Sequence, residues 1–118
     1  ERLLLNQNDT TILKFFLHIS KDEQQRRIEA RIRDPEKRWK FSPNDIVERK
    51  LWDKYMKAYG DAISSTSTDH APWYIVPAEY KWYRNLVVAE TVVDTLESMK
   101  LQYPPAPAGI EFDKLKID

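Results

Sequence analysis

One basic stretch is the part of this sequence best suited to do chemistry. From Arg26 to Lys40 it holds seven basic residues and three acidic ones, whereas the formal net charge of the whole chain is zero. Such a local concentration of cations suits the oxygens of phosphate groups. The alternative interpretation is a solvated, charged helix face, which is a common reason for a run of charges.

The spacing within this stretch indicates how the cations are held. Arg27 and Arg31 lie four residues apart, so on a helix both side chains point the same way. Asp34-Pro35 ends that helix, because the residue before a proline avoids the helical region. Ser42 is a good N-cap for the next helix. We therefore expect residues 27–40 to form a hinged, positively charged flap that binds a phosphate chain.

Two short apolar runs, residues 11–19 and 73–76, predict the strands that position this flap. The first run has little alternation, which is typical of a strand buried on both faces in a parallel sheet. More than fifty residues of mostly helical pattern separate the runs, as a long parallel crossover requires. Two short strands do not make a stable sheet alone. We expect completion by a second copy or by residues N-terminal of this chain.

Apolar periodicity predicts three helices, at residues 21–32, 43–58 and 79–101. The first helix begins after Ser20, and Glu23 three residues later completes a capping-box pattern. The second is expected to end near Gly60. Residues 63–71 are polar and predict a turn-like connection, in which hydroxyl groups serve as caps and turns.

The composition excludes several classes of function. The chain has no cysteine, which excludes disulfides and thiolate chemistry and is compatible with a reducing cytoplasm. No apolar run approaches the roughly 20 residues of a membrane span. The zero net charge gives no general affinity for nucleic acid. Gly60 and Gly109 are the only glycines, so no glycine-rich phosphate loop is present, and His18 and His70 stand apart from any metal-ligand spacing.

Several motifs, read together, resemble a known family. They are Phe16-Leu-His-Ile-Ser-Lys-Asp-Glu-Gln-Gln-Arg-Arg27, Asp34-Pro-Glu-Lys-Arg-Trp-Lys-Phe-Ser-Pro43, Trp52-Asp-Lys-Tyr55, Ala71-Pro-Trp-Tyr74 and Lys81-Trp-Tyr-Arg-Asn-Leu86. This pattern covers nearly the whole chain apart from the proline-rich tail. It resembles the C-terminal half of family 2 polyphosphate kinases, including the lid region.

The resemblance implies an α/β fold, the C-terminal part of a P-loop kinase-like three-layer domain that is mostly helical with two short parallel strands. Residues 1–102 are expected to be the C-terminal half of that domain (strand, lid helices, strand, final helix), and residues 103–118 a proline-rich tail. The implied activity moves phosphate between inorganic polyphosphate and a nucleoside mono- or diphosphate. We also expect a cytoplasmic homo-oligomer with no nucleic-acid or membrane partner.

The family's lid-side cations are carried over residue by residue. The expected phosphate-binding residues are Arg27, Arg31, Lys37, Arg38, Lys40 and Lys81. Trp39 and Trp73 match the pattern and are expected to pack. The family's phosphate loop, with its lysine and aspartate, and its second acidic motif, with its arginine, have no counterpart in these 118 residues. We therefore expect Mg²⁺ to be bound mainly by the N-terminal half, and no catalytic or metal-binding residue in this chain.

Two other function classes fit the same residues. The chain could be a non-catalytic module that binds polyphosphate or a nucleotide without turnover. It could also be a helical protein-interaction domain whose basic stretch is only a solvated face. Whether the chain is a part of the enzyme, a binding module or an interaction domain, we expect no kinase activity from the chain by itself.

Overall fold

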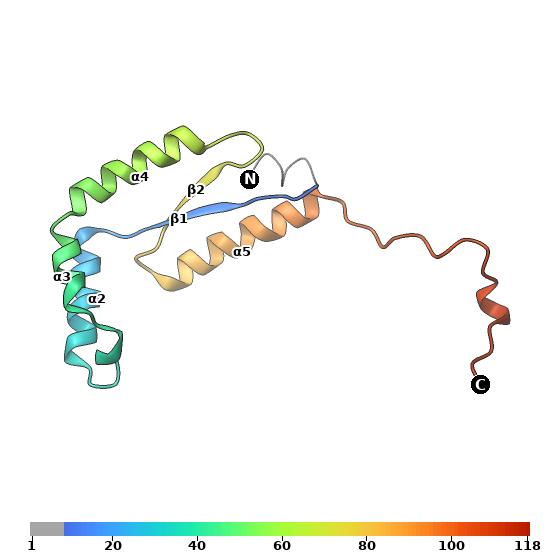
Figure 1. Ribbon diagram of the computed structural model, residues 1–118, viewed down its shortest axis with the longest axis horizontal. Coiled ribbons are helices and arrows are strands. Elements are labelled where there is room, and N and C mark those ends of the chain that lie inside the picture. The colour runs from blue at the N-terminus through green and yellow to red at the C-terminus, as the bar shows by residue number, and fades with distance from the viewer. Residues whose placement is uncertain (1–8) are drawn as a thin grey trace.

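The computed structural model describes residues 9–118, so residues 1–8 of the predicted kinase segment lie outside the described part. The elements are labelled in Figure 1. In chain order they are β1 (Lys14–His18), α2 (Lys21–Arg33), the 3-10 turn η1 (Arg38–Lys40), α3 (Pro43–Arg49), α4 (Trp52–Thr66), β2 (Trp73–Pro77), α5 (Lys81–Ser98) and the 3-10 turn η2 (Phe112–Lys114).

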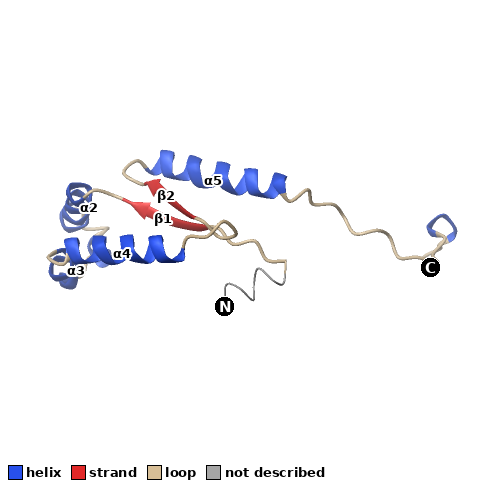
Figure 2. Ribbon diagram, turned by 90° about the horizontal axis from the view of Figure 1, so that it is seen from above, coloured by secondary structure: helices blue, strands red, loops and turns tan. Residues whose placement is uncertain are grey.

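The two strands pair in parallel, from Lys14 opposite Trp73 to His18 opposite Pro77. Figure 2 shows α5 on one face of this two-stranded sheet and α4 on the other. Both predicted strands, their parallel pairing and the three-layer α/β arrangement are therefore confirmed. Since the strands run the same way, their carboxyl ends meet at one edge, where the chain enters α2 and α5.

The start of α2 is held by two separate interactions. Ser20 Oγ accepts a hydrogen bond from the Glu23 amide at 3.1 Å, as predicted for an N-cap. The second half of the predicted capping box is wrong, because the Ser20 amide donates to Glu79 Oε1 at 3.2 Å. The Glu23 carboxylate instead binds Arg26 and Arg27, one turn further along. A charged guanidinium is a stronger partner than a neutral amide.

The single helix predicted for residues 43–58 is broken into α3 and α4. Ser42 and Asp45 form the capping box that opens α3. Neither proline nor glycine stands at the break. The Arg49 guanidinium holds the end of α3 against α2 through the Lys21 carbonyl at 2.6 Å and Gln24 Oε1 at 3.0 Å. Tertiary contacts thus set the direction of α3, and α4 starts afresh at Trp52.

The predicted end of this helix near Gly60 is also wrong. Helix α4 continues through Gly60 to Thr66, so only the second part of the polar 63–71 segment is a connection. A glycine inside a helix costs only about 1 kcal/mol relative to alanine, which six further residues of helix outweigh here. In the last turn of α4, Thr66 Oγ1 donates a hydrogen bond to the Ala62 carbonyl at 2.6 Å.

Little of the described chain is buried. Ala71, Val76 and Ala78 are the buried hydrophobic residues of this part of the chain, and all three lie on or beside β2. Large apolar side chains such as Ile75 on β2 and Trp82 on α5 remain more than 60% exposed. The radius of gyration is 22.5 Å, whereas a compact domain of 100 residues has about 13 Å.

The chain after α5 runs away from the sheet (Figure 1). Lys100 has a φ of 49° at the end of α5, a left-handed conformation that turns the backbone out of the helix. Residues 101–107 form neither helix nor strand, a turn follows at residues 108–109, and η2 is the one helical turn of the tail. Within residues 9–118, no helix has the length and apolar character to cross a membrane.

Candidate functional site

A cavity of about 400 Å³ lies between α2, the connection around η1 and the first turns of α5. We call it the basic pocket. Its lining consists of Ala30 and six basic side chains, namely Arg27, Arg31, Lys37, Lys40, Lys81 and Arg84. No acidic side chain lines it. Six cations around one cavity form a focused positive field, which attracts anions.

Five of the six predicted phosphate-binding residues line this pocket, although Lys81 is more than forty positions away from Lys40 in sequence. The sixth, Arg38, does not line it. Its Nε donates to the Ile32 carbonyl at 2.8 Å. This hydrogen bond satisfies a carbonyl in the last turn of α2, so Arg38 caps the helix that carries the other cations.

The charges of the basic pocket are only weakly compensated. Among the described residues, the side chains of Arg31 and Lys81 make no hydrogen bond and no ion pair. Lys37 Nζ lies 3.2 Å from Asp34 Oδ2, in a pair that is exposed to solvent. Hydrogen bonds from the Glu36 amide and from Lys37 lower the pKa of Asp34, so this carboxylate is ionised at neutral pH. Most of the positive charge is left for a ligand.

The tryptophans divide between packing and exposure. Trp73 is half-buried, with Lys14 Nζ 5.1 Å from its ring and its indole N–H on Thr66 Oγ1 at 2.8 Å, which confirms its packing role. Trp39 is 79% exposed, so its predicted packing role is wrong. Lys40 Nζ lies 5.1 Å from the centre of the Trp39 ring, within the range of a cation–π contact.

Arg27 connects the two walls of the basic pocket. Its Nε donates to Glu23 Oε1 at 3.1 Å, within α2. Its Nη2 donates to the Ala78 carbonyl at 2.7 Å and to the Glu79 carbonyl at 3.1 Å. Together with the Ser20 amide on Glu79, these bonds tie the start of α2 to the connection between β2 and α5. Arg27 therefore fixes the distance across the pocket as well as adding charge to it.

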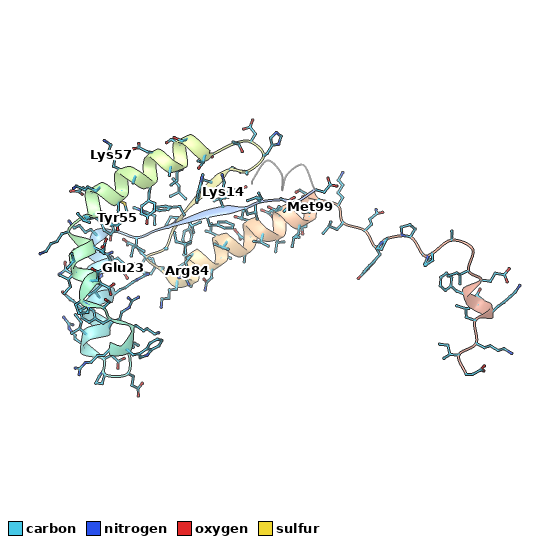
Figure 3. The ribbon with its side chains drawn as sticks, viewed as in Figure 1. Lys14, Glu23, Tyr55, Lys57, Arg84 and Met99 are labelled. Carbon is cyan, nitrogen blue, oxygen red and sulfur yellow. The ribbon has the colours of Figure 1, made fainter. Side chains whose placement is uncertain are left out.

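The Glu23 carboxylate supports this arrangement as an anion. Hydrogen bonds from Arg26 and then from Arg27 lower the pKa of Glu23 below its ordinary value. The carboxylate therefore stays charged at neutral pH and keeps the Arg27 side chain extended toward β2. Figure 3 shows Glu23 on α2 and Arg84 near the start of α5, the two elements that face the pocket.

Arg84 is a pocket residue that the sequence interpretation missed. It is half-buried and donates from Nε and Nη2 to Asn85 Oδ1 at 3.1 and 3.0 Å. The signal for it was present, because Arg84 lies three residues after Lys81 and such residues share one helix face. Helix α5 thus contributes two cations, one of them close to the helix N-terminus, where the helix dipole also favours anions.

The hydroxyl cluster at residues 66–68 is structural. Trp73 N donates to Ser67 Oγ at 3.2 Å, and Ala71 N donates to Thr68 Oγ1 at 3.1 Å. These hydroxyls shape the turn between α4 and β2, as expected for hydroxyl groups in turns. They lie outside the basic pocket.

The family model described as Polyphosphate kinase 2 (PPK2) matches residues 1–104 of this chain. The chain belongs to the polyphosphate kinase 2 family. The family likeness predicted from the motifs is therefore confirmed. The match includes every residue of the basic pocket and stops at the start of the tail.

Two relatives and one solved structure show how this member compares with others of the polyphosphate kinase 2 family. The AMP/ADP-polyphosphate phosphotransferase of Meiothermus ruber is 56% identical over 111 residues, which are 94% of this chain and 41% of that protein. The ADP-polyphosphate phosphotransferase of Rhodopseudomonas palustris is 52% identical over 100 residues, 85% of this chain and 35% of that protein. The crystal structure of Polyphosphate Kinase 2 from Arthrobacter aurescens TC1 superposes with a TM-score of 0.87 at 44% identity, covering 95% of this chain and 40% of that one. The chain therefore spans about two fifths of the length of these proteins.

Proposed function

We propose that this chain is part of a phosphotransferase that moves phosphate between inorganic polyphosphate and a nucleoside mono- or diphosphate. In this proposal the basic pocket grips the phosphate chain during transfer. The observation that carries it is the pocket lining, six basic side chains with no acidic one among them. The names of the relatives, which are AMP/ADP-polyphosphate and ADP-polyphosphate phosphotransferases, support the substrate class.

A clustered site is needed because one cation binds phosphate weakly. A single pair of charges at 4 Å is worth about 1 kcal/mol in water and about 4 kcal/mol at an effective dielectric constant of 20. Several cations around one cavity, held in place by Arg27 and Arg38, act together on neighbouring phosphates. Phosphoryl transfer depends mostly on positioning and on the stabilisation of charge. The basic pocket supplies both for the polyphosphate.

We propose that Mg²⁺ is bound mainly by the other half of the domain. The described residues bring no three His, Asp or Glu side chains together in a way that could hold a metal ion. When bound, Mg²⁺ neutralises charge on the phosphates nearest the reaction. The residues of this chain orient the rest of the phosphate chain. We place this reaction in the cytoplasm, with which the absence of cysteine is compatible.

The test is a salt titration of polyphosphate affinity for the wild-type chain, Arg31→Ala and Lys40→Ala. The controls are Arg33→Ala, on the same helix but outside the pocket and paired with Glu29, and Lys57→Ala on α4 (Figure 3). Each pocket variant should bind more weakly and lower the slope of log affinity against log salt by about one contact. The free energy of unfolding should change by no more than about 0.5 kcal/mol.

The two control variants should keep wild-type affinity and slope. An equal loss in Arg33→Ala and Arg31→Ala would mean that polyphosphate responds to overall charge and not to the pocket. Unchanged affinity in both pocket variants would return these residues to a solvated, charged face and refute the proposed function.

A further inference from the structure

A cavity of about 270 Å³, lined mainly by α2 and α3, shares Arg27 and Arg31 with the basic pocket. We call it the α2–α3 cavity. Unlike the basic pocket, it has two carboxylates in its lining, those of Asp45 and Glu48 on α3. The two arginines that line both cavities therefore have carboxylates of the protein itself as an alternative to phosphate.

Arg27 and Arg31 differ in how they are held. The Arg27 guanidinium is fixed by Glu23 and by the carbonyls of Ala78 and Glu79. The Arg31 guanidinium has no such bond to the described residues. A guanidinium is always charged and binds carboxylate and phosphate oxygens through the same fork of donors. Arg31 is thus the shared cation that a carboxylate of α3 could withdraw from a phosphate chain.

Both carboxylates of the α2–α3 cavity are bound by other groups in this structure. Asp45 Oδ2 accepts a hydrogen bond from the Ser42 amide at 3.2 Å, as part of the capping box of α3. Glu48 Oε2 accepts a hydrogen bond from the Tyr55 hydroxyl, and Glu48 Oε1 accepts one from Asn44 Nδ2 at 3.5 Å. The bond from Asn44 is longer than an ordinary N–H···O bond. Tyr55 is therefore the stronger partner of Glu48.

The Tyr55 side chain is placed for this bond by its own neighbours. Tyr55 lies in the first turn of α4, beside the break from α3 (Figure 3), so its hydroxyl joins two separate helices. Its ring stacks on the Tyr59 ring with centroids 6.2 Å apart, and the Tyr59 ring lies 5.0 Å from that of Phe16 on β1. The hydrogen bond to Glu48 raises the pKa of Tyr55, so the hydroxyl keeps its proton and donates at neutral pH.

We propose that Tyr55 is a positioning residue for the basic pocket. By holding the Glu48 carboxylate, Tyr55 keeps it from pairing with Arg31 and leaves the Arg31 guanidinium available to a phosphate chain. The inference rests on the proposed function, in which the basic pocket binds polyphosphate. Tyr55 lines neither the basic pocket nor the α2–α3 cavity, so it acts on polyphosphate only through Glu48.

The first measurement is the affinity of the 118-residue chain for inorganic polyphosphate, by titration calorimetry. The variants are Tyr55→Phe, Glu48→Gln and the double variant. Tyr55→Phe keeps the ring and removes only the hydroxyl. If the released Glu48 pairs with Arg31 as strongly as a partly exposed ion pair does, binding should weaken about two- to fivefold. The double variant should bind as Glu48→Gln does, because no carboxylate at position 48 is left to compete.

The matched control is Tyr59→Phe, on the same helix. Within residues 9–118 the Tyr59 hydroxyl makes no hydrogen bond, so its removal should leave polyphosphate affinity unchanged. Arg31→Ala should weaken binding in every background, and Tyr55→Phe should add no further loss to it, since the two changes remove the same contact.

The second measurement needs no polyphosphate. Denaturant unfolding of Arg31→Ala, Glu48→Gln and their combination forms a double-mutant cycle, which measures the coupling between the two side chains. The cycle is run with tyrosine and with phenylalanine at position 55. A favourable coupling between Arg31 and Glu48 should appear in the Tyr55→Phe background and be absent from the wild-type background.

The outcomes separate this proposal from the proposed function. Polyphosphate binding that Arg31→Ala weakens and Tyr55→Phe does not overturns the role of Tyr55 and leaves the basic pocket standing. A loss in Tyr55→Phe that Glu48→Gln does not reverse shows that the hydroxyl only supports the fold, and also overturns the proposal. A wild-type chain that does not bind polyphosphate refutes the proposed function. The unfolding cycle then decides whether Tyr55 keeps Glu48 from Arg31, and equal coupling in both backgrounds overturns that inference.

Discussion

Formal charge alone does not decide what a basic side chain does in this molecule. Arg26 and Arg27 are neighbours and both bind the Glu23 carboxylate. The Arg26 side chain is 67% exposed and its bonds stay within α2, whereas the Arg27 side chain is 29% exposed and reaches the carbonyls of Ala78 and Glu79. Arg27 therefore joins α2 to the connection between β2 and α5, whereas Arg26 contacts only α2 itself.

We predict that Arg27→Ala destabilises the chain by about 1–3 kcal/mol, because the part-buried Ala78 carbonyl and the exposed Glu79 carbonyl lose a charged donor. Arg26→Ala is the matched control and should leave the free energy of unfolding nearly unchanged. Arg27→Lys should not restore stability, since an ammonium lacks the planar fork that reaches several acceptors. The measurement is denaturant unfolding followed by circular dichroism. Equal effects of Arg26→Ala and Arg27→Ala would contradict the bridging role.

At the scale of elements, helix ends are set by contacts as much as by local propensity. The break between α3 and α4 occurs without a proline or glycine, because Arg49 holds α3 against α2. Helix α4 passes through Gly60, where local sequence favours an end. These two differences place the polar connection at residues 67–72.

We predict that Gly60→Ala stabilises α4 by about 0.5–1 kcal/mol, because alanine has less conformational freedom to lose in a helix. A Cβ at this position meets nothing within 4 Å, so no clash opposes the gain. Gly109→Ala is the control, since Gly109 has equal space but a φ of 79°, at which an alanine is strained. Helical circular dichroism through a denaturant series should report the gain, and a loss of helix in Gly60→Ala would count against the assignment of α4.

At the scale of the whole molecule, the chain places two cavities of different chemistry at one edge of a small sheet. Parallel strands direct both connections, β1 to α2 and β2 to α5, to that edge. The basic pocket lies between these connections, and a second cavity, whose lining includes His18, Pro77 and Tyr83, lies at the strand ends. The basic pocket gathers six basic side chains at this edge, and within residues 9–118 no three His, Asp or Glu side chains come together in a way that could hold a metal ion.

We predict that the 118-residue chain binds polyphosphate but does not phosphorylate nucleotides by itself. The sequence has no glycine-rich phosphate loop, so part of the positioning that transfer requires is not supplied. The assay incubates the chain with polyphosphate, Mg²⁺ and AMP or ADP, with the phosphotransferase of Meiothermus ruber as positive control. Turnover in the usual kinase range, about 1–100 per second, would disprove this prediction.

The sequence by itself determined the local features of this protein. Apolar runs identified both strands, and Ser20 and Ser42 marked the starts of α2 and α3. Five residues of the basic pocket were predicted from charge density and motif. Such features are predictable because strand and helix periods, N-caps and proline breaks act over a few residues, all of which the sequence displays side by side.

The tertiary structure alone decided which distant residues meet. In the folded chain, Arg38 donates to the Ile32 carbonyl, and Arg27 donates to the connection between β2 and α5. Arg84 also lines the basic pocket. The tertiary structure also replaced the Glu23 half of a capping box with Glu79, fifty-nine residues from Ser20. The physical reason is that a side chain's partner is the strongest acceptor or charge within reach in space, and that neighbourhood exists only after the two parallel strands have paired.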